Sequence, residues 1–373
     1  MDETRSETNF RIPVVFHPGE TVSEFLEVLG WTQKELSRRT GLTPKTISEI
    51  CNGKGPITPQ TSLLFEKVLG RPAHFWLNLQ RAYDESLARS EAVARAQEWQ
   101  EWASVFPTKD LRRLGFLRET GNVVDELLRF LGVSSPDAWR NVWGSTAVAY
   151  RQTRRFEVSS ESMSAWLRAT ELVAQQMNVP QFAPNVLEAS IPRLRGLTRR
   201  RVSDAIEEAR QLCAEAGVAV VLLPEFPHTG ISGCARWVGE RSVIVALSLR
   251  YKTDDQMWFT FFHELGHALL HLGQRKIIMD NPAGDLADSL ADPEMQALED
   301  EANRFAANTL VPADAWADFI SQGEFTNESI PSFADKVGIG PGIVVGRLQR
   351  EGFLKHFQGN AFKQKLSFSG GDA

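Results

Sequence analysis

The chain has 373 residues, of which 42% are hydrophobic and 24% charged, and its formal net charge is −6 at pH 7. This length predicts two or three domains rather than one core, and the acidic balance excludes a uniformly basic nucleic-acid coat protein. The N-terminus lacks a signal-peptide pattern and no apolar run is long enough to cross a bilayer, so we expect a cytoplasmic protein without a membrane partner.

Residues 17–85 are predicted to form short helices separated by glycine turns. Thr32 and Glu35 form a capping box, in which a threonine side chain and a glutamate three residues later satisfy the first backbone N–H groups of a helix. Two short helices joined by a glycine turn are typical of the helix-turn-helix motif. The expected helices begin near Thr21, Thr32, Thr43 and Thr58 and end at Gly30, Gly41, Gly53 and Gly70.

The helix that starts at Thr43-Pro44 is the expected recognition helix of this motif. Between residues 31 and 60 the sequence is basic, although the chain as a whole is acidic, as expected of a phosphate-binding face. An ordinary small helical bundle remains the alternative, because the same geometry also occurs as plain packing. The side chains expected to contact DNA are Gln33, Thr43, Lys45, Thr46, Ser48 and Lys54.

The same stretch resembles the HigA-type antitoxin branch of the Xre/Cro repressor family. The matching motifs are HPGE at 17–20, TQKEL at 32–36, ISEI at 47–50 and FWLNLQ at 75–80. The resemblance implies a five-helix domain that binds double-stranded operator DNA, usually as a homodimer on a palindromic site. It also raises the prospect of a cognate toxin as a partner.

Residues 86–215 are predicted to be a helical middle region. Its first part, 86–100, has the composition of a solvated helical spacer, and Pro180, Pro184 and Pro192 are expected to break the helices that follow. Its tryptophans are expected to be core anchors rather than cofactor contacts: Trp102, Trp139, Trp143 and Trp166.

Residues 216–360 are predicted to form an α+β domain with a small sheet within a mainly helical chain. Two apolar runs, 218–224 and 242–249, predict buried strands with a turn at 230–233 between them. We hypothesise that 242–249 is an edge strand that pairs with an extended peptide substrate. The segment 325–357 predicts a helical packing module rather than a second DNA-binding unit, and the tail after Gly359 is expected to be disordered.

The apolar run 258–272 predicts a buried helix that carries the motif His263-Glu264-Leu265-Gly266-His267. Residues four apart lie on one face of a helix, so the two imidazoles can hold one Zn²⁺ and Glu264 can act as general base toward a water. A buried helix rarely carries such polar groups without a partner. The alternative is a metal-free interaction protein in which the two histidines are accidental.

A third zinc ligand is expected from the helix that contains 298–307. Glu299 is the preferred candidate, with Asn303 on the same face to hydrogen-bond a ligating histidine. Glu301 is the competitor and points about 200° around the helix. His271 is predicted to be a structural or cleft histidine, and the cysteines, which form no C-x-x-C pair, are poor ligands.

Two segments, FTFFHELGHALLH at 259–271 and EDEANRFAANTLVP at 299–312, resemble the ImmA/IrrE family of zinc metallopeptidases. The resemblance covers about 218–312 and implies a zincin-like fold with His263, His267 and Glu299 as ligands and Glu264 as base. Members of that family cleave Xre-type repressors and antitoxins or sense stress. One departure is the long acidic stretch 275–296, interpreted as a lid or inhibitory loop.

Taken together, the sequence predicts a transcriptional regulator or antitoxin that carries a zinc endopeptidase domain. Its substrate would be a regulatory protein, either its own chain or a partner. The main alternative keeps the DNA-binding antitoxin and makes the peptidase-like domain a non-catalytic sensor or toxin-binding platform.

Overall fold

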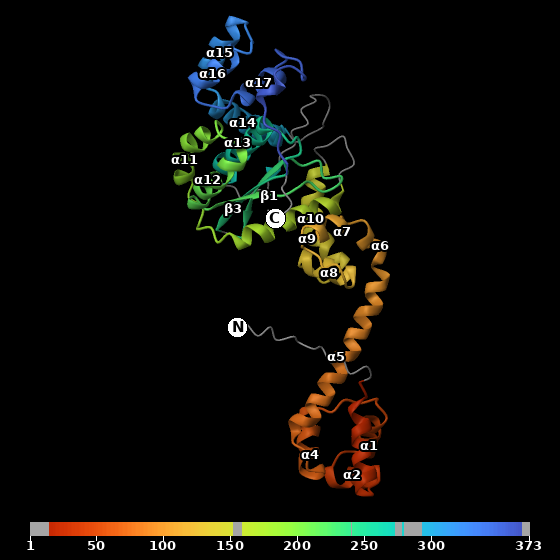
Figure 1. Ribbon diagram of the computed structural model, residues 1–373. Coiled ribbons are helices and arrows are strands. Elements are labelled where there is room, and N and C mark those ends of the chain that lie inside the picture. Colours follow the sequence, from red (N-terminus) through yellow and green to blue (C-terminus); the bar gives the residue numbers. More distant parts are fainter. Residues whose placement is uncertain (1–14, 152–158, 240, 273–277, 280–292, 368–373) are drawn as a thin grey trace, which may run out of the picture. The chain divides into compact units, whose positions relative to one another are not determined.

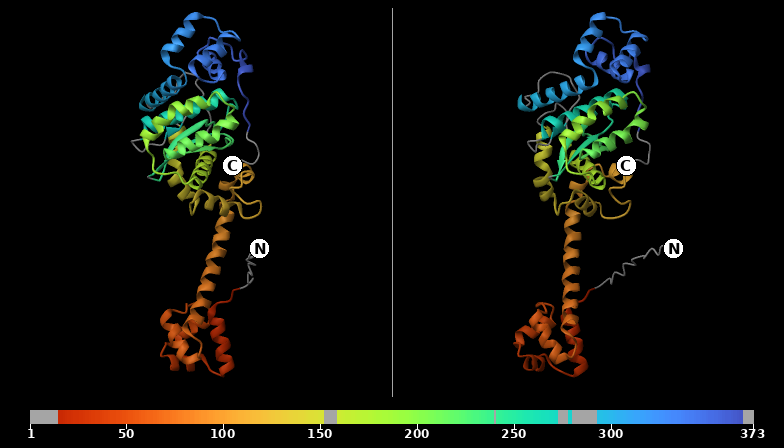
Figure 2. Two further views of the ribbon diagram at one scale, coloured as in Figure 1. Left: turned by 60° about the vertical axis from the view of Figure 1, so that its left-hand side comes forward. Right: turned by 90° about the vertical axis from the view of Figure 1, so that its left-hand side faces the viewer.

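The computed structural model describes residues 15–151, 159–239, 241–272, 278–279 and 293–367. The chain divides into two compact units after Gln100, and each is described by itself. Helices dominate both units (Figures 1 and 2), and the described residues contain one small sheet. The predicted α+β class with mainly α-helical content is therefore confirmed. Among the described helices, none is long and apolar enough to span a bilayer.

The first unit contains the five helices expected of a helix-turn-helix domain (Figure 1). In α2, α3 and α4 the threonine before the helix accepts a hydrogen bond from the backbone N–H three residues later, so each N-terminus is capped as predicted. Helix α1 begins earlier than expected, because His17 caps it by accepting from the N–H of Gly19 at 3.0 Å. The bounds are α1 (Pro18–Leu29), α2 (Gln33–Thr40), α3 (Pro44–Cys51), α4 (Pro59–Leu69) and α5 (Ala73–Glu98).

Trp76 of α5 lies at the centre of the core of this unit. Its side chain is fully buried, and three phenylalanine rings meet it edge-on with centroid distances of 5.0–5.4 Å. At the edge of this core, a Cβ atom on Gly19 would lie 1.7 Å from the carbonyl oxygen of Ile50, so only glycine lets α1 approach the end of α3. Helix α5 continues to Glu98, so the expected spacer 86–100 is largely an extension of this helix.

The second unit surrounds its sheet with helices from both earlier and later parts of the chain. Helix α11 runs through Pro192, which was expected to break it. Trp139, Trp143 and Trp166 are buried as predicted. The helices are α6 (Gln100–Ser104), α7 (Thr108–Arg113), α8 (Val123–Leu131), α9 (Pro136–Arg151), α10 (Ser160–Gln176), α11 (Pro184–Leu197), α12 (Val202–Glu215), α13 (Asp254–Leu270), α14 (Pro293–Leu310), α15 (Ala313–Gln322), α16 (Ser329–Val337), α17 (Pro341–Arg350) and the 3-10 helix η2 (Asn360–Phe362).

The sheet has the strand order β1-β3-β2-β4, with β1 (Val218–Leu222), β2 (Gly233–Val238), β3 (Ser242–Leu247) and β4 (Ile278–Met279). Strands β1 and β3 are parallel, and β2 is antiparallel to β3 and β4. The two predicted strands are thus confirmed, but β3 is central, so the hypothesis that it is a substrate-binding edge strand is wrong. Strand β2 was missed because its first residue, Gly233, suggested a turn.

The two faces of the sheet are covered by different helices. On one face, alternate residues such as Val220 and Val245 share a core with α11, α12 and α13. On the other face α10 packs on the sheet, and the guanidinium of Arg236 donates to the carbonyl of Leu167 at 2.7 Å. Helix α13 therefore lies with one side against the sheet, which leaves its other sides for α14 and α17.

The C-terminal segment packs on α13. The apolar residues of α17, among them Val344, Val345 and Leu348, are buried, and α17 packs against α13. This agrees with the predicted packing module. The prediction of a disordered tail after Gly359 is wrong up to residue 367. Thr253 and Lys365 form an antiparallel bridge, and Lys363 Nζ lies 2.7 Å from a carboxylate oxygen of the buried Asp255. These contacts fix the N-terminal end of α13.

Candidate metal centre

Helices α13 and α14 bring three predicted zinc ligands together. His263 and His267, four residues apart on α13, place their Nε2 atoms 2.9 Å from each other. From α14, the two carboxylate oxygens of Glu299 lie 3.2 Å from His263 Nε2 and 3.4 Å from His267 Nε2. Among the residues that the structure describes, this is the group of side chains whose ligand atoms converge as a metal site requires.

A glycine in the motif lets α14 approach closely enough to contribute Glu299. Gly266 faces α14, and a Cβ atom there would lie 3.0 Å from a ring carbon of Phe305. The apolar residues around the motif, including Phe262 and Leu265, are fully buried and hold α13 in the core. Gly266 and the buried residues around it therefore place α13 and α14 in close contact at the motif.

The donor set fits zinc in spacing and in protonation. Ligand atoms about 2.0–2.2 Å from a tetrahedral ion lie about 3.3 Å from one another, close to the three distances observed here. Burial lowers the pKa of His267 to about 4, so its imidazole is neutral at pH 7. Burial alone would raise the pKa of Glu299, but the hydrogen bonds and charge of the two histidines outweigh it and bring the pKa to about 2. Neutral imidazole and ionised carboxylate are the forms that bind zinc.

Asn303 lies where the sequence placed it, one turn after Glu299. Its Oδ1 atom is 3.1 Å from Nδ1 of His263. Because an amide oxygen only accepts, Nδ1 of His263 carries the proton and Nε2 is left with its lone pair for a metal. Glu301 points elsewhere, toward His271, at 3.1 Å, and has a half-exposed side chain.

Glu264 is fully buried beside the first residue of β2. A Cβ atom on Gly233 would lie 2.4 Å from Glu264 Oε1 and 2.7 Å from the methyl carbon of Thr260. Gly233 is therefore needed to leave room for the Glu264 carboxylate. Sequence reasoning missed this role, and the signal was a glycine at the start of an otherwise apolar strand.

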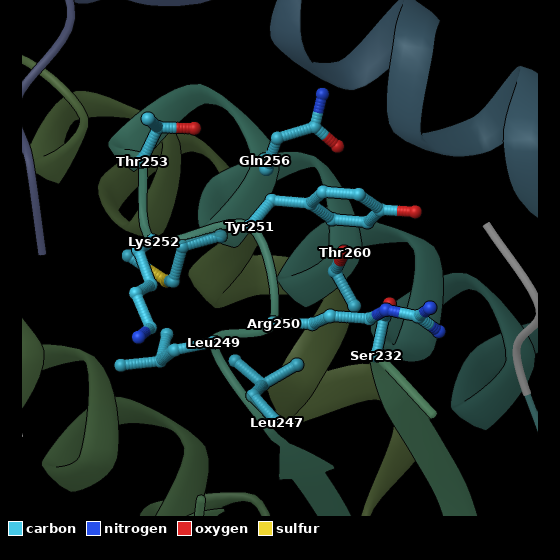
Figure 3. A pocket seen from close by; sticks show the side chains of 10 residues that line it. Ser232, Leu247, Leu249, Arg250, Tyr251, Lys252, Thr253, Gln256 and Thr260 are labelled. Atoms are coloured by element: carbon cyan, nitrogen blue, oxygen red, sulfur yellow. The ribbon is translucent and has the colours of Figure 1, made fainter. Parts of the chain in front are cut away.

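A pocket that is partly open to solvent is lined by the loop 249–253 and by residues of α13 (Figure 3). It reaches α13 at Thr260, one turn before Glu264, and Ser232, the residue before β2. The buried Oγ atom of Ser232 has no hydrogen-bond partner among the described residues. Tyr251, which is exposed, also lines the pocket.

The cysteines take no part in this centre. Burial raises the pKa of Cys213 and of Cys234 to about 12, so both thiols stay protonated at neutral pH. The acidic stretch 275–296 is interpreted from the sequence as a lid or inhibitory loop, and most of it, 275–277 and 280–292, lies outside the described residues.

In the first unit, the residues expected to contact DNA lie at the start of α2, along the first half of α3 and in the turn after α3. Gln33, Lys45 and Lys54 are exposed. The Thr43 and Thr46 hydroxyls lie 2.9 Å apart, and the Ser48 hydroxyl accepts from Asn52 at 3.1 Å. Two of the basic residues between 31 and 60, Arg38 and Arg39, form ion pairs with Glu35. The positive charge of this segment is therefore partly offset.

Comparison with known proteins gives separate matches in the first and the second unit of the chain. A helix-turn-helix family model matches residues 23–76, and the peptidase-family model described as IrrE N-terminal-like domain matches residues 217–349. One of the relatives that match in sequence is an uncharacterized HTH-type transcriptional regulator of Escherichia coli (strain K12), 35% identical over 20% of this chain and 77% of its own. Another is antitoxin HigA-1 of Vibrio cholerae, 39% identical over 16% of this chain and 57% of its own.

A solved structure, an addiction module antidote protein of a HigA family from Coxiella burnetii, is 32% identical over 22% of this chain and 92% of its own, with a TM-score of 0.22. The predicted fusion is confirmed by the two family matches, which lie in separate parts of one chain. The chain therefore belongs to the helix-turn-helix regulators related to HigA antitoxins, and it carries a C-terminal metallopeptidase-like domain of the IrrE type.

Proposed function

We propose that the protein is a DNA-binding regulator or antitoxin whose C-terminal domain is a zinc-dependent endopeptidase. The observation that carries the enzymatic part is the convergence of His263, His267 and Glu299. The buried Glu264 lies on the same turn of α13 as the two histidines. Two purely structural helices would have little reason to bring two imidazoles and two carboxylates together where they pack, because each group must be desolvated.

His263, His267 and Glu299 would hold the ion, which leaves one tetrahedral position open. When bound, zinc supplies a Lewis acid that polarises the scissile carbonyl and lowers the pKa of a water. Glu264 accepts the proton of the attacking water at its carboxylate and passes it to the leaving amine. Asn303 keeps the His263 ring in the orientation and tautomer that ligation requires.

A pocket lined by Thr260, one helical turn before Glu264, supports a peptide substrate. Its walls are apolar at Leu247 and Met257 and polar at Ser232 and Thr260. An extended substrate would pass over this pocket with its scissile bond at Glu264. The substrate class that we propose is a regulatory protein, either a copy of this chain or a partner.

The peptidase proposal is tested by digesting a degenerate peptide mixture with the zinc-loaded protein. New peptide termini, identified by mass spectrometry and absent with the Glu264→Gln protein, would support it. A wild-type protein that binds zinc but yields no termini, with peptides or with its own chain, would favour the non-catalytic platform.

The DNA-binding proposal rests on the exposed N-terminal part of α3 and on the helix-turn-helix relatives. We propose that this helix contacts double-stranded operator DNA and that two copies bind a palindromic site. A cognate toxin is proposed as a second partner because one relative is named a HigA antitoxin.

Replacing Lys45 with alanine should weaken DNA binding without affecting the metal centre. The Lys45 side chain is 85% exposed, and its Nζ atom lies 3.8 Å from a carboxylate oxygen of Glu49. Such a long, exposed ion pair is weak, so the lysine charge is available for a phosphate. Losing one phosphate contact should lower the slope of log affinity against log salt by about 1. Fluorescence anisotropy with a random-sequence DNA duplex at several salt concentrations measures this change.

Lys67→Ala is the matched control, because Lys67 is an exposed lysine of α4 and the charge change is the same. It should leave the slope almost unchanged. Equal effects of the two substitutions would mean that binding follows total charge and that α3 has no special role.

A further inference from the structure

We infer that His271 and Glu301 form a relay that positions the zinc ligand His267, and that its outer end is accessible from solvent. This inference rests on the proposed zinc site. His271 is the residue directly after α13, and Glu301 lies on α14. The sequence indicated only a structural role for the histidine and a competing ligand role for the glutamate.

The first contact of the relay fixes the tautomer of His267. Its Nδ1 atom lies 2.9 Å from Nδ1 of His271, and both rings are buried. If Nε2 of His267 provides its lone pair to the ion, the proton of this neutral ring is on Nδ1. His267 Nδ1–H then donates to His271 Nδ1, which must be the unprotonated nitrogen of the second ring.

The second contact fixes the tautomer of His271. With its Nδ1 atom accepting, the proton is on Nε2, which lies 3.1 Å from Glu301 Oε2. A carboxylate oxygen accepts this hydrogen bond. The chain of donors therefore runs in one direction, from His267 through His271 to Glu301, with every proton assigned.

The two ligating histidines are supported differently. His263 donates to a neutral amide, Asn303, whereas His267 is linked through a second imidazole to a carboxylate. A carboxylate at the end of such a chain makes the ligating ring a better electron donor than an amide does. The Glu301 side chain is 50% exposed, so a partner or the solvent can reach this end of the relay.

The relay predicts a graded loss of zinc affinity. His271→Ala should weaken zinc binding about 10–100-fold, because supporting partners of metal ligands have effects of this size. Glu301→Ala should weaken it by a smaller factor, about tenfold or less, since its carboxylate is partly solvated. His271→Asn, which retains an acceptor near the position of Nδ1, should recover much of the loss.

The measurement is chelator competition for zinc on the full chain, together with thermal unfolding of the metal-free protein. Asp300→Ala is the matched control, because Asp300 is an exposed acid between Glu299 and Glu301 whose carboxylate accepts a hydrogen bond from Gln296. It should bind zinc as the wild type does. The relay also predicts that Glu301→Ala has no further effect in the His271→Asn protein.

Three outcomes separate the claims. If the wild type binds no zinc, the proposed function fails. If the wild type binds zinc and His271→Ala binds it equally well, or if Glu301→Ala and Asp300→Ala behave alike, the relay is wrong and the zinc site stands. If affinity falls only in proportion to a loss of stability of the metal-free protein, His271 is merely structural and the relay is again wrong.

Discussion

Replacing Glu264 with glutamine is expected to lower peptide hydrolysis by about 10²–10⁴-fold, because that is the usual contribution of a general base. Glutamine has nearly the same shape as glutamate, so the buried position beside Gly233 can accept it without moving α13. The zinc content should stay at the wild-type value. The rate of appearance of new peptide termini and the zinc content of the same preparation are the two measurements.

Asp300→Ala is the control for this substitution too, since it removes an exposed acid from the neighbouring helix and should leave the rate unchanged. Hydrolysis that persists at the wild-type rate in the Glu264→Gln protein would mean that Glu264 is not the base. Loss of both hydrolysis and zinc would mean that Glu264 is needed to form the site, and its chemical role would then be undetermined.

Replacing Trp76 with alanine is expected to destabilise the first unit severely. Removing a fully buried tryptophan costs about 3–5 kcal/mol. The whole stability of a unit of this size is about 4–10 kcal/mol. The melting temperature of this unit should fall by more than about 12 °C, and DNA binding should be lost at physiological temperature. Calorimetry of the full chain and binding to a random-sequence duplex measure the two effects.

Leu63→Ala is the matched control for the Trp76 substitution. Leu63 is an apolar residue of the same unit, but it is 53% exposed, so its removal should change stability by no more than about 0.5 kcal/mol. Zinc binding by the second unit should survive both substitutions. If Trp76→Ala abolished zinc binding as well, the two units could not fold independently.

The sequence could predict features that depend on neighbouring residues. Helices α2, α3 and α4 of the first unit begin with capping threonines, and such caps are local hydrogen bonds within three residues. The spacing of His263 and His267 on one helix is local too. Glu299 and Asn303 were chosen because residues four apart share a face, and the structure places both near the histidines.

The features that sequence reasoning missed depend on contacts between distant segments. Gly233 was expected in a turn, but its role arises from the carboxylate of Glu264, which packs against it from another element. The central position of β3 follows from its pairing with β1 and β2, which no local pattern specifies. Pro192 is tolerated inside α11, although local propensity predicts a break.

The contact between His271 and Glu301 was missed for a similar reason. Helical spacing indicated that His271 lies too far along α13 to share the ion, and it indicated that Glu301 faces away from Glu299. Neither statement shows that the two side chains meet. Only the packing of α14 along α13 brings them within 3.1 Å of each other.

The most direct test of the account is the zinc content of the purified protein, measured by elemental analysis without added metal. The wild type should contain about one zinc per chain, and His267→Ala should contain almost none. His356→Ala, which removes an exposed histidine outside the site, should match the wild type. A wild-type protein without zinc, even after reconstitution, would contradict the proposed metal centre and the peptidase activity together.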